Sequence, residues 1–262
     1  MLRALYTAAS GMEAQQLNID TIAHNLANIN TSGFKLRKAQ FQDLLYQNIR
    51  QAGASNTATT EIPVGLQVGL GTKPVATEMI FSQGDFSTTN NPLDVVIQGQ
   101  GFFQIRQVNG QIAYTRNGSF HLNRDGNVVT SEGDSLDPQI TIPQDQIGIT
   151  IGSDGTVSVL QAAQTQPQQV GRIEIALFQN PAGLQNIGKN LLLATQASGE
   201  AITGTPGENG LGTLLSGFVE QSNVSVVEEM ITMIISQRAY EANSKVIRTA
   251  DEMFTQANNV VR

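Results

Sequence analysis

Residues 1–30 read MLRALYTAASGMEAQQLNIDTIAHNLANIN, an amphipathic segment. Its apolar residues recur at alternating steps of four and three, which is the spacing of a coiled-coil seam. Only Gln15 interrupts the series, and the pattern predicts one helix from Met1 to about Asn30. A helix cannot bury such a stripe by itself, so this one requires a partner. The stripe consists of Met1, Leu5, Ala8, Met12, Ile19, Ile22, Leu26 and Ile29.

The helical pattern ends in an asparagine-rich segment that continues as NTSGFK over residues 30–35. Asparagine is a poor residue inside a helix, so Asn25 and Asn28 have two explanations of equal weight. The first is fraying near the helix end, and the second is hydrogen bonding to a neighbouring helix. We predict that Gly33 adopts the left-handed conformation that follows many helix C-termini, with Phe34 as the hydrophobic contact behind it.

A second long segment with helical periodicity runs from about Val224 to Val261. Ser225 is a candidate N-cap, and Glu228 stands at the spacing of a capping box. The apolar steps are mostly four, four and three, closer to an eleven-residue repeat than to strict heptads. The apolar positions are Val224, Ile231, Ile235, Ala239, Ala242, Val246, Ala250, Met253, Ala257 and Val261.

Between these helices the pattern changes several times. Residues 36–50 again carry helical spacing and predict a further helix, whereas residues 51–60, QAGASNTATT, read as a flexible linker. Residues 62–82 return to short extended pieces, and residues 198–217 are glycine-rich and predicted as loop. The apolar positions of the expected third helix include Phe41, Leu44, Leu45 and Ile49.

The middle of the chain, from about 84 to 215, is rich in short β-strands separated by turn sequences such as Asn109-Gly110 and Asp125-Gly126. Strands this closely spaced predict an antiparallel sandwich or barrel-like module, and with the terminal helices the fold class is α+β. The expected strands are Val95–Ile97, Phe102–Val108, Ile112–Thr115, Ser119–Leu122, Val128–Thr130, Ile140–Ile142, Ile149–Ile151, Thr156–Leu160, Ile173–Phe178 and Leu191–Ala194.

The composition excludes several classes of function. The net charge of −7 argues against binding nucleic acid, which requires a basic surface. The densest basic group, Lys35, Arg37 and Lys38, is expected to complement the dipole of the preceding helix. The sequence contains no cysteine and no apolar run near the roughly 20 residues of a membrane span, so we expect no disulfide and no membrane insertion. The apolar stretch near residue 1 is too short for a cleavable signal peptide, and none is expected.

A search for chemistry identifies no candidate catalytic, cofactor-binding or metal-binding residue. The two histidines, His24 and His121, lack metal-ligand spacing and are expected to be structural. Residues 123–127 slightly resemble a calcium loop, but Arg124 and the lack of an acidic twelfth ligand favour a turn. The sequence therefore predicts a protein that is not an enzyme.

The two ends of the chain resemble the terminal signatures of bacterial flagellar basal-body rod and hook proteins. The N-terminal motifs are AASGMEAQQ at 8–16 and NLANINTSGFK at 25–35. The C-terminal motifs are SVVEEM at 225–230 and QRAYEANSK at 237–245. Within that family, DLLYQ at 43–47, PVGLQVG at 63–69 and TRNGSF at 115–120 are most similar to the distal-rod members. The resemblance runs almost end to end.

This resemblance implies that the two terminal helices pair as an inner coiled-coil domain, with the seam of the first packed against Ile231, Ile235, Ala239, Val246 and Met253. Subunits would stack helically into a rigid tube that transmits torque and forms part of an export channel. The implied domains are 1–35 with 222–262, a connecting segment 36–83 with a distal-rod insertion at about 46–65, and a β-rich outer domain 84–221.

The resemblance also implies where subunits meet. The rod-stiffening segment would include Tyr46, Gln47, Pro63 and Gly65. The terminal-helix residues expected in self-assembly are Leu5, Met12, Ile19, Ile22, Leu26, Asn25, Asn28, Asn30, Gly33, Phe34, Ile231, Ile235, Ala239, Tyr240, Asn243, Val246 and Met253.

The partners implied by the resemblance are further copies of the chain, proximal rod proteins, the hook protein and the surrounding P- and L-ring proteins. Export would proceed through the flagellar type III apparatus without a cleaved signal, and the rod would span the periplasm within the basal body. Two alternatives stay open: a hook or proximal-rod subunit, and a secreted β-rich carbohydrate-binding protein. The second is disfavoured because tryptophan is absent and aromatic residues make up only 5% of the chain.

Overall fold

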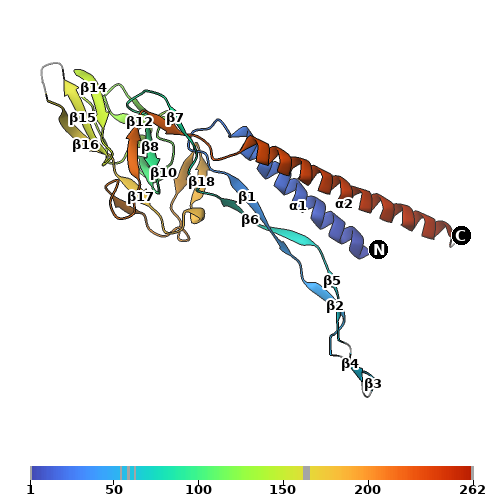
Figure 1. Cartoon of the computed structure of the whole chain (residues 1–262). Coiled ribbons are helices and arrows are strands. Elements are labelled where there is room, and N and C mark those ends of the chain that lie inside the picture. The colour runs from blue at the N-terminus through green and yellow to red at the C-terminus, as the bar shows by residue number, and fades with distance from the viewer. Residues whose placement is uncertain (1, 54, 58–59, 62, 162–165, 261–262) are drawn as a thin grey trace. The chain divides into compact units, whose positions relative to one another are not determined.

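The computed structural model describes residues 2–53, 55–57, 60–61, 63–161 and 166–260. The chain divides into two compact units, the first formed by Met1–Leu26, Arg37–Glu78 and Ser225–Arg262, and the second by Ala27–Leu36 and Met79–Val224. Helices lie near both ends of the sequence and antiparallel strands fill the middle, so the predicted α+β class is confirmed (Figure 1). None of the described helices is both long and apolar enough to cross a membrane.

The first unit contains two long helices, α1 (Leu2–Ala27) and α2 (Val226–Val260), which lie side by side (Figure 1). The second begins directly after Ser225 and carries Glu228 and Glu229 in its first turn, where carboxylates interact favourably with the helix dipole. Helix α1 ends at Ala27, three residues before its predicted end at Asn30. Residues 28–34 form successive turns, in which the amide of Thr31 donates to the carbonyl of Asn28 and that of Phe34 donates to the carbonyl of Thr31.

The predicted helix at 36–50 is wrong. These residues form β1 (Arg37–Asp43) and β2 (Tyr46–Arg50), the first half of a two-stranded ribbon. Spacing of apolar residues identifies a helix only when they face a core, but Phe41 and Ile49 are exposed, and the backbone is satisfied by cross-strand pairing instead. The pairs are β1 with β6 (Thr72–Met79), β2 with β5 (Leu66–Gly69) and β3 (Ser55–Thr57) with β4 (Thr60–Glu61).

The second unit is built from short strands around an apolar core. Its largest sheet has the order β11-β12-β13-β9-β10-β19-β18, with β17 pairing both β9 and β20, and the small sheets are β14-β15-β16, β21-β8 and β22-β7. The bounds are β7 Phe86–Thr88, β8 Val95–Gln98, β9 Phe102–Arg106, β10 Ile112–Thr115, β11 Phe120–Leu122, β12 Val128–Thr130, β13 Ser135–Leu136, β14 Gln146–Ile151, β15 Thr156–Gln161, β16 Gln168–Arg172, β17 Ile175–Leu177, the 3₁₀ turn η1 Pro181–Gly183, β18 Gln185–Gly188, β19 Leu191–Leu193, β20 Ile202–Gly204, β21 Thr213–Ser216 and β22 Phe218–Glu220.

Two clusters of buried side chains hold this unit together. The larger one spans the sheets and includes Phe103, Phe120 and Leu136, with the Phe103 and Phe120 rings edge to face at 5.1 Å. The smaller one centres on Phe178, whose ring packs edge to face against Phe102 and Tyr114. Most expected strands are present, and their pairing is antiparallel wherever the register is defined.

Two expectations for this unit were wrong. The predicted strand Ile140–Ile142 forms only an isolated bridge, between Thr141 and Asn127, although both isoleucines are buried in the larger cluster. Conversely, residues 198–217 contain β20 and β21, which pair with β17 and β8. Their many glycines and small residues hid a strand pattern that is stabilised by pairing with distant strands rather than by local preference.

Candidate assembly surfaces

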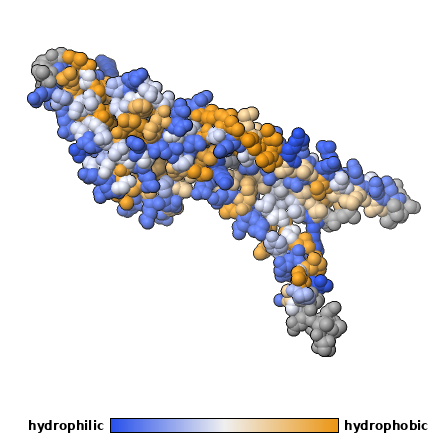
Figure 2. Space-filling model, viewed as in Figure 1, coloured by the Kyte–Doolittle hydropathy of each residue, from blue (hydrophilic) through white to orange (hydrophobic). Residues whose placement is uncertain are grey.

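The C-terminal helix exposes most of its large apolar side chains. Ile231, Ile235, Val246 and Met253 were expected to pack against α1, but all four are exposed, with Ile235 at 63%. That intramolecular packing is therefore wrong for these residues. Figure 2 shows apolar residues gathered over the N-terminal half of α2, where Val227, Met230 and Ile234 are exposed as well.

The face of α2 that is buried carries mainly small and polar residues, with Met233 and Ile247 half-buried beside them. Ser236 and Ala250 are buried, and Ala239 and Asn243 are half-buried, whereas Tyr240 is exposed. Small side chains allow two helix backbones to approach closely. The pair of helices is thus held along a narrow, weakly apolar strip, and the larger apolar surface of α2 is left without a partner in the single chain.

The predicted stripe of α1 is more fully used. Ile22 is buried, and Ala14 is also buried, which fills the gap that Gln15 leaves in the predicted seam. Ala14 can take part in the contact although it lies one residue before the predicted position, because its small methyl group fits where the two helix backbones are close. Ala8 is buried too, Leu5, Met12, Ile19, Leu26 and Ile29 are half-buried, and Met1 lies outside the described residues.

Asn25 lies at the point where both helices meet the ribbon. Its side-chain Nδ2 donates to the carbonyl of Arg37 at 2.8 Å and to Oε2 of Glu229 at 3.0 Å, while its Oδ1 accepts from the amide of Arg37 at 2.9 Å. The hydrogen bond to Glu229 of α2 shows that, for Asn25, contact with a neighbouring helix is the correct explanation. Asn28 accepts from the Thr31 hydroxyl at 3.2 Å within the turn, and Asn30 is exposed.

Gly33 and Phe34 occupy the segment that follows α1. Gly33 has a φ of 70°, so the predicted left-handed conformation is confirmed, although α1 ends too early for Gly33 to cap it. A Cβ at Gly33 would lie 2.6 Å from the backbone nitrogen of Asn117, so only glycine fits this close approach. Phe34 is buried beside it.

A buried charge cluster, which we define as Lys35, Arg116 and Glu220, holds this segment in place. Nζ of Lys35 lies 2.6 Å from Oε1 of Glu220, and Nε of Arg116 lies 2.7 Å from Oε2 of the same carboxylate. The Lys35 side chain also donates to the carbonyl of Ser82 at 2.7 Å. One buried carboxylate therefore joins two buried cations from distant parts of the sequence.

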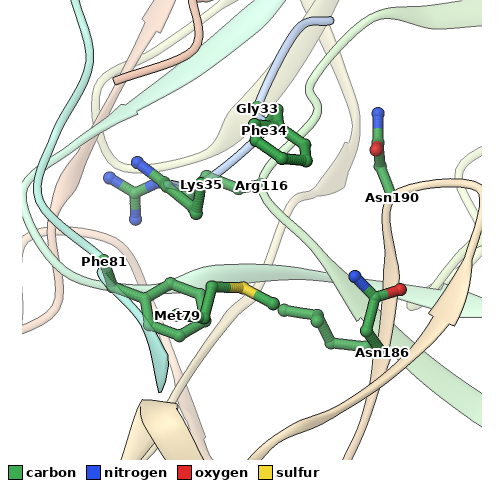
Figure 3. A pocket seen from close by; sticks show the side chains of 9 residues that line it. Gly33, Phe34, Lys35, Met79, Phe81, Arg116, Asn186 and Asn190 are labelled. Atoms are coloured by element: carbon green, nitrogen blue, oxygen red, sulfur yellow. The ribbon is translucent and has the colours of Figure 1, made fainter. Parts of the chain in front are cut away.

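The surroundings of the cluster satisfy its remaining donors. The Arg116 guanidinium also donates to the backbone carbonyls of Ile97, Gly99 and Gly101. Burial lowers the pKa of Lys35, an effect that the Glu220 carboxylate partly offsets. Figure 3 shows Lys35 and Arg116 beside a cavity of about 30 Å³, which has room for little more than water.

Sequence reasoning missed this cluster. The sequence predicts that Lys35 complements a helix dipole, and no local pattern marks Arg116 or Glu220, because residues 81 to 185 positions apart meet only in the folded unit. The TRNGSF motif at 115–120 contains Arg116 and was the available signal. An arginine beside a tight turn gives no indication of burial by itself.

The β-ribbon exposes a further set of apolar side chains. Leu45 is 85% exposed, and Tyr46, Ile49 and Leu66 are exposed as well. Of the predicted stiffening residues, Tyr46 pairs with Gly69 and Gln47 with Val68, while Pro63 is exposed and Gly65 half-buried. Residues 54, 58–59 and 62 of the predicted insertion lie outside the described residues. An isolated two-stranded ribbon is marginally stable in water, so this one requires contacts with a partner.

Within the described ranges, no group of three or more acidic or histidine side chains is arranged to hold a metal ion. His121 makes a contact of 3.3 Å between its Nε2 and the hydroxyl of Ser131 on the surface of the β unit. The exposed apolar surfaces of α2 and of the ribbon are the candidate functional surfaces.

Comparison with known families gives three matches along the chain. They are the flagella basal body rod protein model at residues 5–35, the flagellar hook protein FlgE/F/G D1 domain at 96–159, and the flagellar basal body rod FlgEFG protein C-terminal model at 215–260. The first and last of these cover most of α1 and α2. The central one covers strands β8 to β15 of the second unit.

Individual relatives match over the whole length. The chain is 51% identical to the flagellar basal-body rod protein FlgG of Borreliella burgdorferi, with 100% of both chains covered. It is 50% identical to FlgG of Caulobacter vibrioides over 100% of both, and 49% identical to FlgG of Buchnera aphidicola from Schizaphis graminum over 97% of both. The flagellar hook-basal body complex protein FlhP of Bacillus subtilis is 30% identical over 99% of this chain.

Proposed function

The chain belongs to the FlgG family of flagellar basal-body rod proteins, and from that membership we propose that its α1–α2 pair and its β-ribbon build the rod. The protein is a structural subunit of the flagellar distal rod. The similarity of about 50% identity over nearly the whole chain to several FlgG proteins does not favour a hook or proximal-rod subunit. No observation favours a carbohydrate-binding protein or an enzyme.

The observation that carries the proposal is the exposed apolar face of α2. Burying an isoleucine or methionine side chain that is otherwise exposed contributes about 1.5–3 kcal/mol. Ile231, Ile235, Val246 and Met253 lie along one helix and are all exposed in the single chain. In a helical polymer each of these side chains would be covered by the next subunit, so many weak contacts would add up to a stiff tube.

We assign the helix pair to the wall of a central channel. The pair would form a coiled coil, in which Asn25 and Ile22 hold the two helices together and the exposed residues Ile231, Ile235, Val246 and Met253 contact neighbouring subunits. The β unit would then lie on the outside of the tube. Torque applied at one end would pass through the summed contacts of the helices and the ribbon.

The proposed partners follow from the resemblance to the flagellar rod family. They are further copies of this chain, the proximal rod and hook proteins at the two ends of the distal rod, and the P- and L-ring proteins around it. We place the polymer in the basal body, across the periplasm, and propose that subunits reach it through the flagellar type III export apparatus.

Purified full-length protein is expected to form straight tubes with a central hole when concentrated. Negative-stain and cryo-electron microscopy would show them, because the apolar faces of α2 can be buried only by association. A protein that stays monomeric at every concentration and salt condition in which its relatives polymerise would contradict the proposed role.

Deleting residues 46–65 is expected to give a more flexible or curved polymer. This deletion removes β2 and the outer part of the ribbon, including the exposed side chains of Tyr46 and Ile49. The contacts that we propose stiffen the tube are lost with them. Persistence length measured on electron micrographs of the two polymers is the readout. Unchanged stiffness would argue against the ribbon as a strut and would favour a hook-type or proximal-rod role.

A further inference from the structure

Three contacts between α1 and α2 recur at a constant interval. Asn25 Nδ2 lies 3.0 Å from Glu229 Oε2, and Asn18 Nδ2 lies 2.8 Å from Ser236 Oγ. At Gly11, a Cβ would come within 2.8 Å of the side-chain nitrogen of Asn243. Successive contacts are seven residues apart on both helices, at 25, 18 and 11 on α1 and at 229, 236 and 243 on α2, so the helices run antiparallel.

We propose that this polar ladder, defined as the pairs Asn25/Glu229, Asn18/Ser236 and Gly11/Asn243, sets the register in which α1 and α2 pair. The proposal rests on the proposed function, because it concerns the helix pair that we assign to the channel wall. It adds a specific task for residues that contribute little apolar contact. Polar residues in a helix–helix seam typically lower stability but select one register over others.

The remaining residues of the seam provide few large buried side chains that could select the register, with Ile22 of α1 as the exception. The side chains buried between the helices are largely small, such as Ala8, Ala14 and Ala250. An alanine fits equally well opposite another small residue one turn away. Most of the large apolar residues of α2, which could interlock, are exposed instead, and Met233 and Ile247 are half-buried.

A shift of α2 by one turn would leave buried polar groups without partners. Such a shift moves the helix by about 5.4 Å. Asn18 would then face Met233 or Tyr240 in place of Ser236, and the Ser236 hydroxyl, on a residue that is only 2% exposed, would lose its hydrogen bond. A buried polar group without a hydrogen bond is strongly disfavoured, so the two hydrogen-bonded rungs penalise the shifted registers, and at the third the close approach of Asn243 requires a residue without a Cβ at position 11.

The first rung is fixed to the ribbon as well as to α2. Both donors and the acceptor of the Asn25 amide are used, two of these contacts going to the backbone of Arg37. Asn25 is 1% exposed. The ladder therefore begins from a side chain that cannot move without breaking the start of β1, and the other two rungs extend that register along the helices.

The absence of cysteine allows the register to be read by disulfide trapping in the full-length chain. Continuing the seven-residue interval beyond Gly11 and Asn243 predicts that Ala4, which is exposed, lies opposite the buried Ala250. The pair Ala4→Cys with Ala250→Cys reports the native register. Ala4→Cys combined with Ile247→Cys or with Phe254→Cys reports a shift of about one turn in either direction.

Oxidation in dilute solution traps whichever register the helices visit, and the monomeric disulfides are quantified by mass spectrometry. In the otherwise unchanged chain the native disulfide should dominate. With Asn18→Leu and Ser236→Leu added, the ratio of shifted to native disulfides should rise about tenfold, because the central rung is lost and apolar contact is retained. The control Gln16→Leu with Gln237→Leu adds the same two leucines at exposed positions and should leave the ratio unchanged.

An exchanged rung provides the second variant. Asn18→Ser with Ser236→Asn keeps one amide and one hydroxyl at the rung and should return the ratio to within about twofold of the unaltered chain. The proposal fails if the leucine pair keeps the native ratio or if the exchanged rung does not restore it. If none of the cysteine pairs forms a disulfide in the chain that keeps Asn18 and Ser236, the helix pairing and the ladder are both refuted. Tube formation tests the rod function separately.

Discussion

Replacing Glu220 by glutamine is expected to lower the free energy of unfolding of the β unit by about 3–5 kcal/mol, the usual result of removing one partner from a buried ion pair. The Glu220 carboxylate is the shared partner of Lys35 and Arg116, and it also accepts from the amide of Gly84 at 3.0 Å. Its side chain is 1% exposed, so water cannot take its place. Two buried cations would remain without a counter-charge.

The loss should also release the segment that follows α1. Lys35 reaches the β unit through this carboxylate, and the amide of Gly33 donates to the backbone carbonyl of Glu220 at 2.9 Å. Small proteins are stable by only about 5–15 kcal/mol, so the substitution removes a large share of the total. We expect the midpoint of thermal unfolding to fall by roughly 10 °C or more.

Hydrogen exchange of the paired β9 and β10 amides, together with urea unfolding, measures this effect within the full-length chain. Glu132→Gln is the matched control, because it removes the same charge from an ion pair of 2.8 Å with Lys189 in which both side chains are more than half exposed. That pair should contribute at most about 1 kcal/mol. Similar losses for the two variants would show that burial of the cluster has no energetic consequence.

Replacement of the whole cluster by apolar residues would not be harmless either. In some proteins a buried ion pair can be exchanged for apolar side chains without loss. Here the Arg116 guanidinium also satisfies the carbonyls of Ile97, Gly99 and Gly101. An apolar residue would remove the donor from the buried carbonyl of Gly101, at a cost of about 1–3 kcal/mol, whereas the carbonyl of Ile97 would keep its hydrogen bond from Gln83 Nε2.

The sequence predicted the parts of the fold that depend on local pattern. The terminal helices were located to within a few residues because a long apolar stripe at helical spacing has few other interpretations. Turn sequences located most of the strands in the β unit. The prediction of a helix at 36–50 is wrong because apolar residues such as Phe41 and Ile49 are exposed on a ribbon. Their spacing therefore does not reflect packing against a core.

The features that could not be predicted depend on residues far apart in the chain. Glu220 lies 185 positions from Lys35, and no local pattern connects them. The orientation of α2 was equally hidden, since its apolar residues could face α1 or a neighbouring subunit. In the single chain Ser236, and not Ile235, is buried, so the apolar residues face away from α1. Close approach of the two helices favours the smaller side chain.

That orientation leads to the second large effect: Ile235→Glu should abolish polymerisation while leaving the single chain folded. Ile235 is 63% exposed, so a carboxylate there meets water in the monomer and disturbs no contact with α1. In the proposed tube the same position is covered by a neighbouring subunit. Burying an unpaired carboxylate costs several kcal/mol, so the critical concentration should rise at least about a hundredfold.

Sedimentation of polymer against protein concentration measures this change, and the motility of cells that carry the variant as their only copy provides an independent readout. Ile235→Val, which keeps an apolar side chain, should assemble within about threefold of the normal concentration, since it removes only one methylene. Gln237→Glu places the same charge two residues away on the exposed surface of α2 and separates the effect of position from that of charge. If Ile235→Glu polymerises as readily as the unaltered chain, α2 does not use this face for assembly, and the apolar contacts of the rod must come from the ribbon instead.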